Sequence, residues 1–282
     1  MQNALPKLGI IAGGGAAPQR LIETCQKLGR PFFVICLEGQ AAPDFAQNVA
    51  HAWIHLGAFG KLKALAESEA LKEVVLIGRV RRPSLAELKP DWLALKLLPK
   101  IGIGAFGDDA LMRAVGKAIE DEANVRVVGA HEVFSDLLTP VGQLSRVAAD
   151  EDARNDIARG LEVATALGRL DVGQAAIVQQ GIVLGVEGIE GTDALIVRCG
   201  ALRREGPGGV LVKIAKPQQD TRFDLPTIGP DTVAAAAKAG LRGIAVEAWR
   251  SLLIEREKTI AMADQAGLFV IGLSLADAKA NG

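Results

Sequence analysis

Short apolar runs alternate with amphipathic segments through the first half of the chain. The runs lie at 8–12, 32–37, 52–56 and 74–77, and the amphipathic segments include 18–28 and 61–70. Apolar runs of this length are typical of buried strands, and apolar residues three or four positions apart are typical of helices. Buried strands that alternate with helices indicate a parallel sheet covered on both faces. The pattern therefore predicts an α/β domain in the first half.

The second half resumes the alternation after a looser stretch. Residues 135–149 contain the turn formers Thr139, Pro140 and Gly142, so we expect a linker there between a domain at 1–134 and a second, distinct α/β domain at 150–282. The elements expected in the second domain are a helix at 151–167, a hairpin of 176–179 and 182–186 that turns at Gln180-Gly181, a helix capped by Thr192, a strand at 210–214, a helix after Pro230, and strands at 243–247 and 268–271.

Charge and cysteine content narrow the functional classes. The chain has 32 Lys and Arg residues against 33 Asp and Glu residues, and this balance does not support non-specific nucleic-acid binding, so we expect no nucleic-acid partner. Its three cysteines show no CxxC spacing, which favours a reduced compartment over a disulfide framework. No signal-peptide core and no long charge-free apolar stretch occur. We therefore expect a cytoplasmic protein that meets any lipid substrate at a membrane surface.

A glycine turn follows the first predicted strand. Gly13, Gly14 and Gly15 stand between that strand and a helix, where backbone amides can approach a phosphate. Glu38 follows the second strand, at the place where dinucleotide-binding folds put an acid on ribose hydroxyls. Pro18 stands where the G-x-G-x-x-G pattern would have its third glycine. The pattern favours nucleotide binding over a plain tight turn with a solvated acid.

Two further candidates follow later strands of the first half. Arg79 belongs to the basic stretch 78–83, after the fourth strand. Arginines at the carboxyl edge of a sheet suit phosphate binding, although a solvated basic loop fits as well. His131 follows the segment 126–129, where the chain is expected to return to the sheet, and comes just before the expected linker. We take it as a substrate-binding candidate.

The densest polar cluster lies in the second half. Its members are Lys213, Lys216, Gln218, Gln219, Asp220, Arg222 and Asp224, followed by Thr227 at a helix start. Lysine and arginine beside two aspartates suit phosphoryl transfer, because the cations neutralise phosphate oxygens while the carboxylates hold Mg²⁺ or position a water. A salt-bridged loop is the alternative. The acidic turn at 187–193, with Glu190, Thr192 and Asp193, is a second candidate site. A role of Thr192 as a helix cap would explain part of this turn without a ligand.

At these segments the sequence resembles a known family. The matching stretches are 11–15, 129–132, 170–174 with Gln174, 187–193 and, above all, the long motif at 216–229. They are similar to those of the UDP-2,3-diacylglucosamine pyrophosphatases of bacterial lipid A synthesis, the LpxI type.

The resemblance implies an enzyme that hydrolyses a lipid nucleotide-sugar to UMP and 2,3-diacylglucosamine 1-phosphate (lipid X). It further implies a Rossmann-like N-terminal domain, product held between the domains, and dependence on Mg²⁺ (or Mn²⁺), for which we name Asp220 and Asp224 as ligands. In the mechanism that the resemblance implies, water attacks the sugar-side phosphorus and Asp224 is central to catalysis; we group Asp220, Arg222 and Lys213 with it. Because the substrate is a lipid, we also expect transient contact with the cytoplasmic face of the inner membrane. Whether the protein forms a homodimer is left open.

Two other functions stay open beside this one. The glycine turn and Glu38 would also suit a nicotinamide-dependent oxidoreductase, although the glycine spacing is imperfect and no site for hydride transfer is evident. A non-catalytic nucleotide or lipid sensor would leave the charge cluster at 220–224 without a role.

Overall fold

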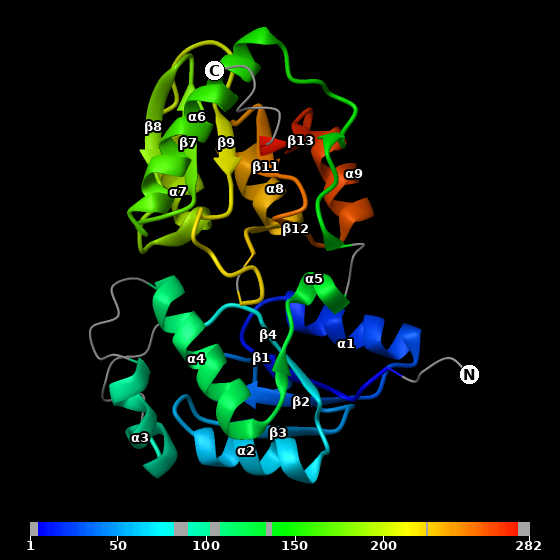
Figure 1. The fold of residues 1–282 in the computed structure, drawn as a ribbon. Coiled ribbons are helices and arrows are strands. Elements are labelled where there is room, and N and C mark those ends of the chain that lie inside the picture. The colour runs from blue at the N-terminus through cyan, green and yellow to red at the C-terminus, as the bar shows by residue number, and fades with distance from the viewer. Residues whose placement is uncertain (1–4, 82–89, 102–107, 134–136, 224, 276–282) are drawn as a thin grey trace. The chain divides into compact units, whose positions relative to one another are not determined.

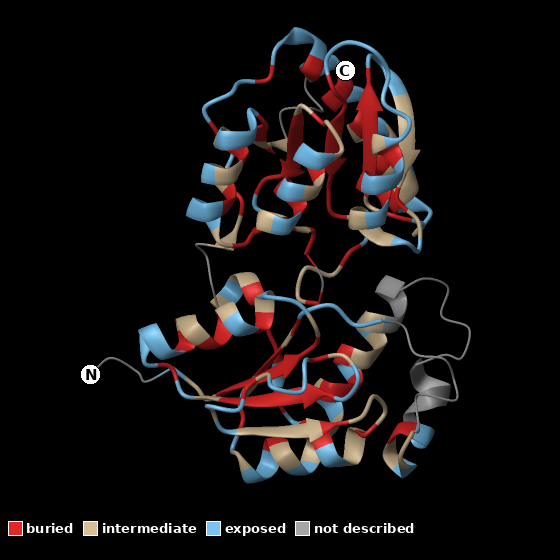
Figure 2. Cartoon of the chain, turned by 180° about the vertical axis from the view of Figure 1, so that it is seen from behind, coloured by how far each residue is buried: buried red, intermediate tan, exposed pale blue. Residues whose placement is uncertain are grey.

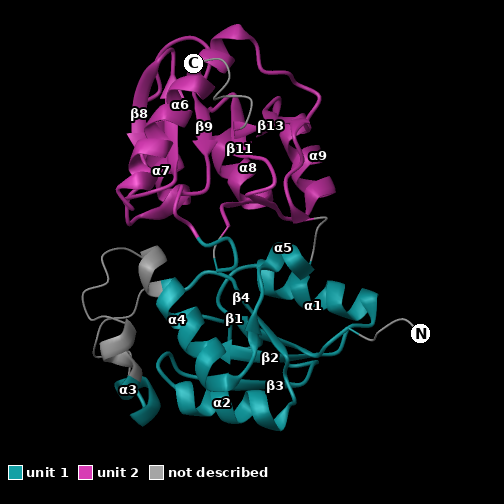
Figure 3. Ribbon diagram, viewed as in Figure 1, with its two compact units in different colours: residues 1–133, 220–224 teal, residues 134–219, 225–282 magenta. Residues whose placement is uncertain are grey.

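The computed structural model describes residues 5–81, 90–101, 108–133, 137–223 and 225–275. The chain forms two compact units (Figure 3). Unit 1 comprises Met1–Val133 and Asp220–Asp224, and unit 2 comprises Phe134–Gln219 and Leu225–Gly282. The chain therefore passes between the units three times.

Unit 1 is built on a parallel five-stranded sheet (Figure 1). Its strands are β1 (Leu8–Ala12), β2 (Phe32–Leu37), β3 (His51–Ile54), β4 (Glu73–Ile77) and β5 (Arg126–Val127), in the order β3-β2-β1-β4-β5. Every neighbouring pair is parallel. This order is the one that dinucleotide-binding folds use, and it reverses direction between β1 and β4.

Helices cover the unit 1 sheet. They are α1 (Ala17–Leu28), α2 (Phe59–Ser68), α4 (Asp108–Ala123) and the short α5 (Ala130–Val133), while α3 (Trp92–Ile101) packs against α2 and α4. Local sequence sets the ends of α1, because Pro18 lies in its first turn and Gly29 takes the left-handed conformation at its end. The side chains of α2 and α4 share one core with one face of the sheet.

Unit 2 contains a mixed six-stranded sheet. Its strands are β6 (Gly142–Gln143), β7 (Ala175–Gln179), β8 (Ile182–Val186), β9 (Val210–Lys213), β11 (Gly243–Glu247) and β13 (Phe269–Leu273), in the order β6-β13-β11-β9-β7-β8. The three central strands β9, β11 and β13 are parallel, whereas the other pairs are antiparallel. A small parallel sheet pairs β10 (Thr227–Ile228) with β12 (Leu252–Leu253).

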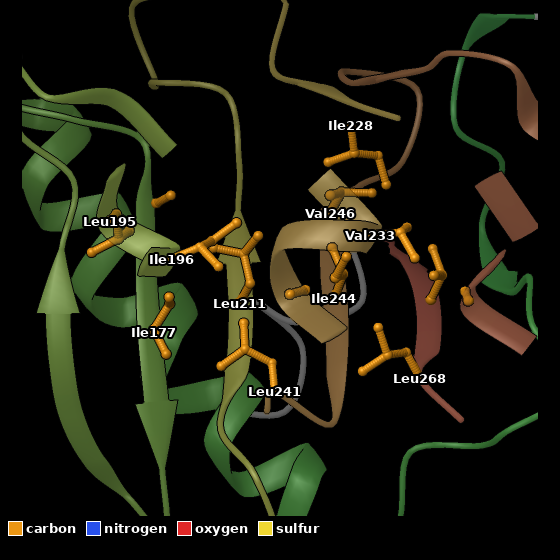
Figure 4. Close-up of a cluster of buried hydrophobic side chains, with 14 of the residues drawn as sticks. Ile177, Leu195, Ile196, Leu211, Ile228, Val233, Leu241, Ile244, Val246 and Leu268 are labelled. Atoms are coloured by element: carbon orange, nitrogen blue, oxygen red, sulfur yellow. The ribbon is translucent and has the colours of Figure 1, made fainter. Parts of the chain in front are cut away.

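Both faces of the unit 2 sheet are covered. The helices are α6 (Glu151–Arg169), α7 (Gly191–Gly200), α8 (Pro230–Lys238) and α9 (Arg256–Ala266). Side chains of α7, α8 and α9 pack with one face in a large aliphatic cluster (Figure 4), and α6 packs on the other face with Val212 and Phe269. The inner strands are buried, the edge strands β3 and β8 are mostly of intermediate burial, and the helices are exposed on their outer sides (Figure 2).

The predicted α/β fold class is confirmed in both units. The predicted hairpin is also confirmed, with Gln180 and Gly181 both at positive φ, as a tight two-residue turn requires. The stretch expected as a linker differs, because β6 pairs with β13 inside the unit 2 sheet. Helix α9 was not anticipated. Among the described residues, no helix has the length and apolar character needed to cross a membrane.

Candidate active site

The loops after β1 and β4 are joined where the strand order of unit 1 reverses. Gly13 donates its amide hydrogen to the Ile77 carbonyl (N···O 2.9 Å), and Gly14 and Arg79 exchange two amide-to-carbonyl bonds of 2.8 Å. A Cβ at Gly13 would stand 2.5 Å from the Arg79 carbonyl oxygen, so this close approach requires glycine. The bare amides that we expected at Gly13 and Gly14 are therefore bonded within the chain.

Three other predicted residues lie at the same edge, where β1, β2, β4 and β5 end; we call it the unit 1 edge. Gly15 has φ of 89° and no heavy atom beyond its chain neighbours within 4 Å of where a Cβ would stand. Glu38, directly after β2, and Arg79 are exposed. Parallel α/β sheets bind ligands outside this edge, at the point where the strand order reverses.

The segment 220–223 packs into unit 1 although it comes late in the sequence. Phe223 is buried in the unit 1 core with Ile119 of α4 and Val127 of β5. Its ring lies against Gly116 of α4, where a Cβ would overlap the ring atoms. Phe223 thus anchors in unit 1 the Asp220 and Arg222 residues that we had expected in the second domain.

Arg222 joins two carboxylates at the unit 1 edge. Its Nη2 donates to Asp220 (2.8 Å) and its Nη1 donates to Glu120 of α4 (3.2 Å). The hydrogen bond from Arg222 lowers the pKa of the Asp220 carboxyl, and burial only partly opposes this. Asp220 is therefore ionised at neutral pH beside a charged guanidinium.

His131 lies beside the inserted segment. A Cβ on Gly129, which follows β5, would stand 2.5 Å from His131 Nδ1 and 3.2 Å from Arg222 Cα. The Nδ1 atom is buried and has no hydrogen-bond partner among the described residues. An unpaired buried nitrogen is uncommon in proteins, and a bound ligand is one way to pair it.

Asp224, the predicted catalytic residue and metal ligand, lies outside the described residues. Its two neighbours in the chain are both buried, Phe223 in unit 1 and Leu225 in unit 2.

Two lysines place positive charge at one edge of the unit 2 sheet, where β8, β9 and β11 end and β7 begins; we call it the unit 2 edge. Lys213 is buried at the end of β9 and donates to the Thr227 carbonyl (3.1 Å). Lys216 forms an ion pair with Asp171 at the end of α6 (2.5 Å). The predicted residues Gln219 and Thr227 shape the backbone here: the Gln219 side chain accepts from the Lys216 amide (2.9 Å).

A buried carboxylate organises the acidic turn at the same edge. Glu187 accepts from the Gln174 amide (3.0 Å) and from the Thr192 hydroxyl (2.5 Å). We expected Thr192 to cap α7; that prediction is wrong, because Glu190 occupies the cap position and no side chain caps the helix. The side-chain oxygen of Gln174 is buried and has no hydrogen-bond partner within the described part of the chain.

Glu190 and Asp193 play different parts in this turn. Glu190 accepts from the Gly188 amide (3.1 Å) and pairs with Arg198 (2.7 Å). Hydrogen bonds from its own amide and from Arg198 hold the pKa of Glu190 below its usual range. Asp193 lies in the first turn of α7.

Sequence reasoning missed Glu120, Glu247 and Arg250. Glu120 lies 102 positions before its partner Arg222. It also lies on an amphipathic helix, where a charged residue is expected without any functional role. Glu247 ends a strand and carries no local signal beyond that position.

Models of known protein families match both halves of the chain. The LpxI N-terminal domain model matches residues 7–137, and the LpxI C-terminal domain model matches residues 140–271. The chain belongs to the LpxI family. A curated relative, UDP-2,3-diacylglucosamine pyrophosphatase LpxI from Caulobacter vibrioides, is 44% identical over 274 residues, which cover 95% of this chain and 97% of the relative.

The family match covers both parts of the candidate site, since 11–15 and 129–132 fall in its N-terminal model and 170–174, 187–193 and 216–229 in its C-terminal model. A solved structure, a GalE-like L-threonine dehydrogenase from Cupriavidus necator, aligns over 98% of both chains with a TM-score of 0.30 and 12% identity. A likeness this low supports no conclusion, so membership in the LpxI family rests on sequence.

Proposed function

We propose that the chain hydrolyses the pyrophosphate of UDP-2,3-diacylglucosamine to UMP and lipid X. The observation that carries the proposal is the 44% identity, along nearly the full length of both chains, to a relative named as that pyrophosphatase. Neither the nicotinamide-dependent oxidoreductase nor the sensor is favoured by this match.

Unit 1 is the half that we assign to the uridine nucleotide. Its sheet order is that of nucleotide-binding folds, and Glu38 follows β2 where such folds place an acid for the ribose. Because the Gly13 and Gly14 amides are bonded to Ile77 and Arg79, the contacts that we assign to the nucleotide are Gly15, Glu38, Arg79 and His131 Nδ1, which has no partner among the described residues.

Unit 2 is the half that we assign to the sugar phosphate. Lys213 and Lys216 supply positive charge for phosphate oxygens. The buried oxygen of Gln174 needs a donor, and a sugar hydroxyl or the amide of an acylated glucosamine can supply one. Glu190, Thr192, Asp193, Gln219 and Thr227 complete this proposed set.

We assign the chemical step to the segment 220–224. Asp224 holds a water in line with the sugar-side phosphorus. The water oxygen bonds to that phosphorus and gives up one proton to solvent, while the bond to the bridging oxygen breaks and UMP leaves with the electron pair. Arg222, anchored in unit 1 with Asp220, neutralises the departing UMP. Fixed cations at a departing phosphate contribute several kcal/mol in such reactions.

We propose Mg²⁺ or Mn²⁺, held through oxygen ligands, as the metal cofactor. The described residues contain no group of three or more His, Cys, Asp or Glu side chains suited to a metal. Mg²⁺ commonly binds one or two carboxylates plus substrate phosphates and keeps several waters, which suits Asp220 together with Asp224. The metal would neutralise charge on the pyrophosphate oxygens.

We also propose a transient contact with the cytoplasmic face of the inner membrane. Ile189 is fully exposed, and Leu170 and Val172 are exposed nearby, on a segment bonded to the Ile189 turn through Gln174 and Glu187. Flotation with phospholipid vesicles tests the contact: Ile189→Ser should reduce the bound fraction, and an unchanged fraction would exclude this surface.

UMP release tests the proposed function. The purified chain, given the lipid nucleotide and Mg²⁺, should release UMP, and EDTA should stop the release until excess Mg²⁺ restores it. An oxidoreductase would consume a nicotinamide cofactor instead, and a sensor would bind without turnover. Full activity after exhaustive chelation would exclude the metal from the mechanism.

A further inference from the structure

The loop at 215–219, which carries Lys216 and Gln219, is bonded on two sides within unit 2. On the α6 side, Lys216 pairs with Asp171 and the Gln218 side chain donates to the Gly168 carbonyl (2.6 Å). A Cβ on Gly168 would stand 3.0 Å from Pro217 Cδ and 3.2 Å from Lys216 Cα, which is closer than ordinary van der Waals contact. The backbone of the loop is therefore fixed closely against the end of α6.

Glu247 and Arg250 fix the same loop from the other side. A Glu247 carboxylate oxygen accepts from the Ala215 amide (2.9 Å), and Arg250 donates to the Lys216 carbonyl (3.4 Å). Arg250 also donates to the second oxygen of Glu247 (3.3 Å). One ion pair thus bonds the two successive residues at which the chain leaves β9 and enters the loop.

The turn that presents this pair has an unusual backbone. Trp249, between Glu247 and Arg250, has φ of 61°, a conformation that costs a bulky residue free energy. Hydrogen bonds hold it there: the Trp249 amide donates to the Thr139 carbonyl (2.9 Å), and the buried Ser251 hydroxyl donates to the Glu247 carbonyl (2.6 Å). Strained turns that the surrounding structure holds in place are concentrated at functional sites.

Stability alone does not account for Glu247. It is 4% exposed, and burial raises the pKa of its carboxyl, an effect that Arg250 and the Ala215 amide only partly offset. A well-packed apolar residue commonly stabilises such a position more than an ion pair does. The burial of this carboxylate therefore points to a role besides the packing of unit 2.

We propose that Glu247 and Arg250 are positioning residues for the hydrolysis, acting through the loop at 215–219. They hold Lys216 and Gln219 in place for the sugar phosphate and fix the backbone from which the chain continues into 220–224. This inference rests on the proposed function. Glu247 and Arg250 act through the loop and do not contact the substrate.

Two single variants test the proposal in the full chain with Mg²⁺. Glu247→Gln keeps an acceptor for the Ala215 amide but loses the charge that holds Arg250; Arg250→Gln removes both of its bonds. We expect each to lower kcat about tenfold with KM within about twofold, since small misplacements of catalytic groups act on the transition state. The double variant should lose no more than the worse single one.

A readout independent of turnover is amide hydrogen exchange in peptides that cover 214–219, which should become faster in both variants while the core of α6 is unchanged. Glu162→Gln is the matched control, because Glu162 pairs with Arg159 three residues away on the exposed side of α6. Inactive wild type would contradict the proposed function itself. Active wild type with unchanged kcat and unchanged exchange in both variants would overturn the positioning role alone.

Discussion

At the scale of single residues, Arg222 sets the charge state of the nearby Asp220 and also pairs with a carboxylate that is distant in the sequence. Arg222 connects Asp220 with Glu120, which the sequence places far apart. The hydrogen bond from Arg222 lowers the pKa of Asp220, so this carboxylate stays ionised under the conditions in which a divalent cation would bind. The sequence identified Asp220 and Arg222 as candidates but gave no sign of Glu120.

Asp224 is the residue on which we expect turnover to depend most. Asp224→Ala should abolish most UMP release, because the water then loses the group that positions it. Substrate should still bind, because the change removes the group assigned to the chemical step and leaves the other proposed substrate contacts in place. Steady-state rates together with binding of the lipid nucleotide check this, and near-normal turnover would contradict the assigned role.

Glu247 gives a prediction about pH. Burial is the main cause that raises the folded-state pKa of Glu247 above the ordinary value of 4.5. Between the unfolded-state and folded-state pKa values, the folded state therefore binds more protons than the unfolded state. Stability from this group is complete below the unfolded pKa and is lost as pH rises through the folded pKa. Glu247→Gln should therefore gain Tm relative to wild type as pH rises from 4.5 towards neutral; a difference that is constant with pH would argue against the shift.

At the scale of elements, the sequence predicted what local patterns control. The strands at 8–12 and 32–37, the hairpin and the start of α8 at Pro230 follow from apolar runs and turn residues. It did not predict β6, because two residues carry no pattern, or the insertion of 220–223 into unit 1. That insertion depends on Phe223 meeting Gly116, a contact between distant segments.

The fit of Phe223 on α4 gives a test of this insertion. Gly116→Ala adds a methyl group where the ring lies; overpacking costs about 1–3 kcal/mol, and the gain in helix propensity offsets up to about 1 kcal/mol. We expect lower thermal stability and about tenfold slower UMP release, because Arg222 shifts with the ring. Lys117→Ala, on the exposed side of the same helix, should leave both unchanged.

At the scale of the whole molecule, the units do not follow the order of the sequence. The family models divide the chain near residue 138, whereas residues 220–224 belong with unit 1. No periodicity could reveal this, because the segment is short and its partners are remote. Its consequence is that one loop brings charged residues from the second half of the chain to the unit 1 edge.

Two buried residues on either side of Asp224 should therefore stabilise different units. Phe223→Ala should reduce amide protection in β1, β4 and β5, and Leu225→Ala in β9 and β11, each by about 2–5 kcal/mol. Hydrogen exchange resolved by peptide measures both in the full chain. Loss of protection in the same unit for both variants would contradict the division at 224.

Hydrolysis in ¹⁸O-labelled water, followed by mass spectrometry of both products, tests the central claim most directly. The account predicts UMP and lipid X in equal amounts, with one labelled oxygen in the phosphate of lipid X and none in UMP. Unchanged substrate would contradict the proposed activity. Label in UMP would show attack at the uridine-side phosphorus and would reverse the roles assigned to the two units.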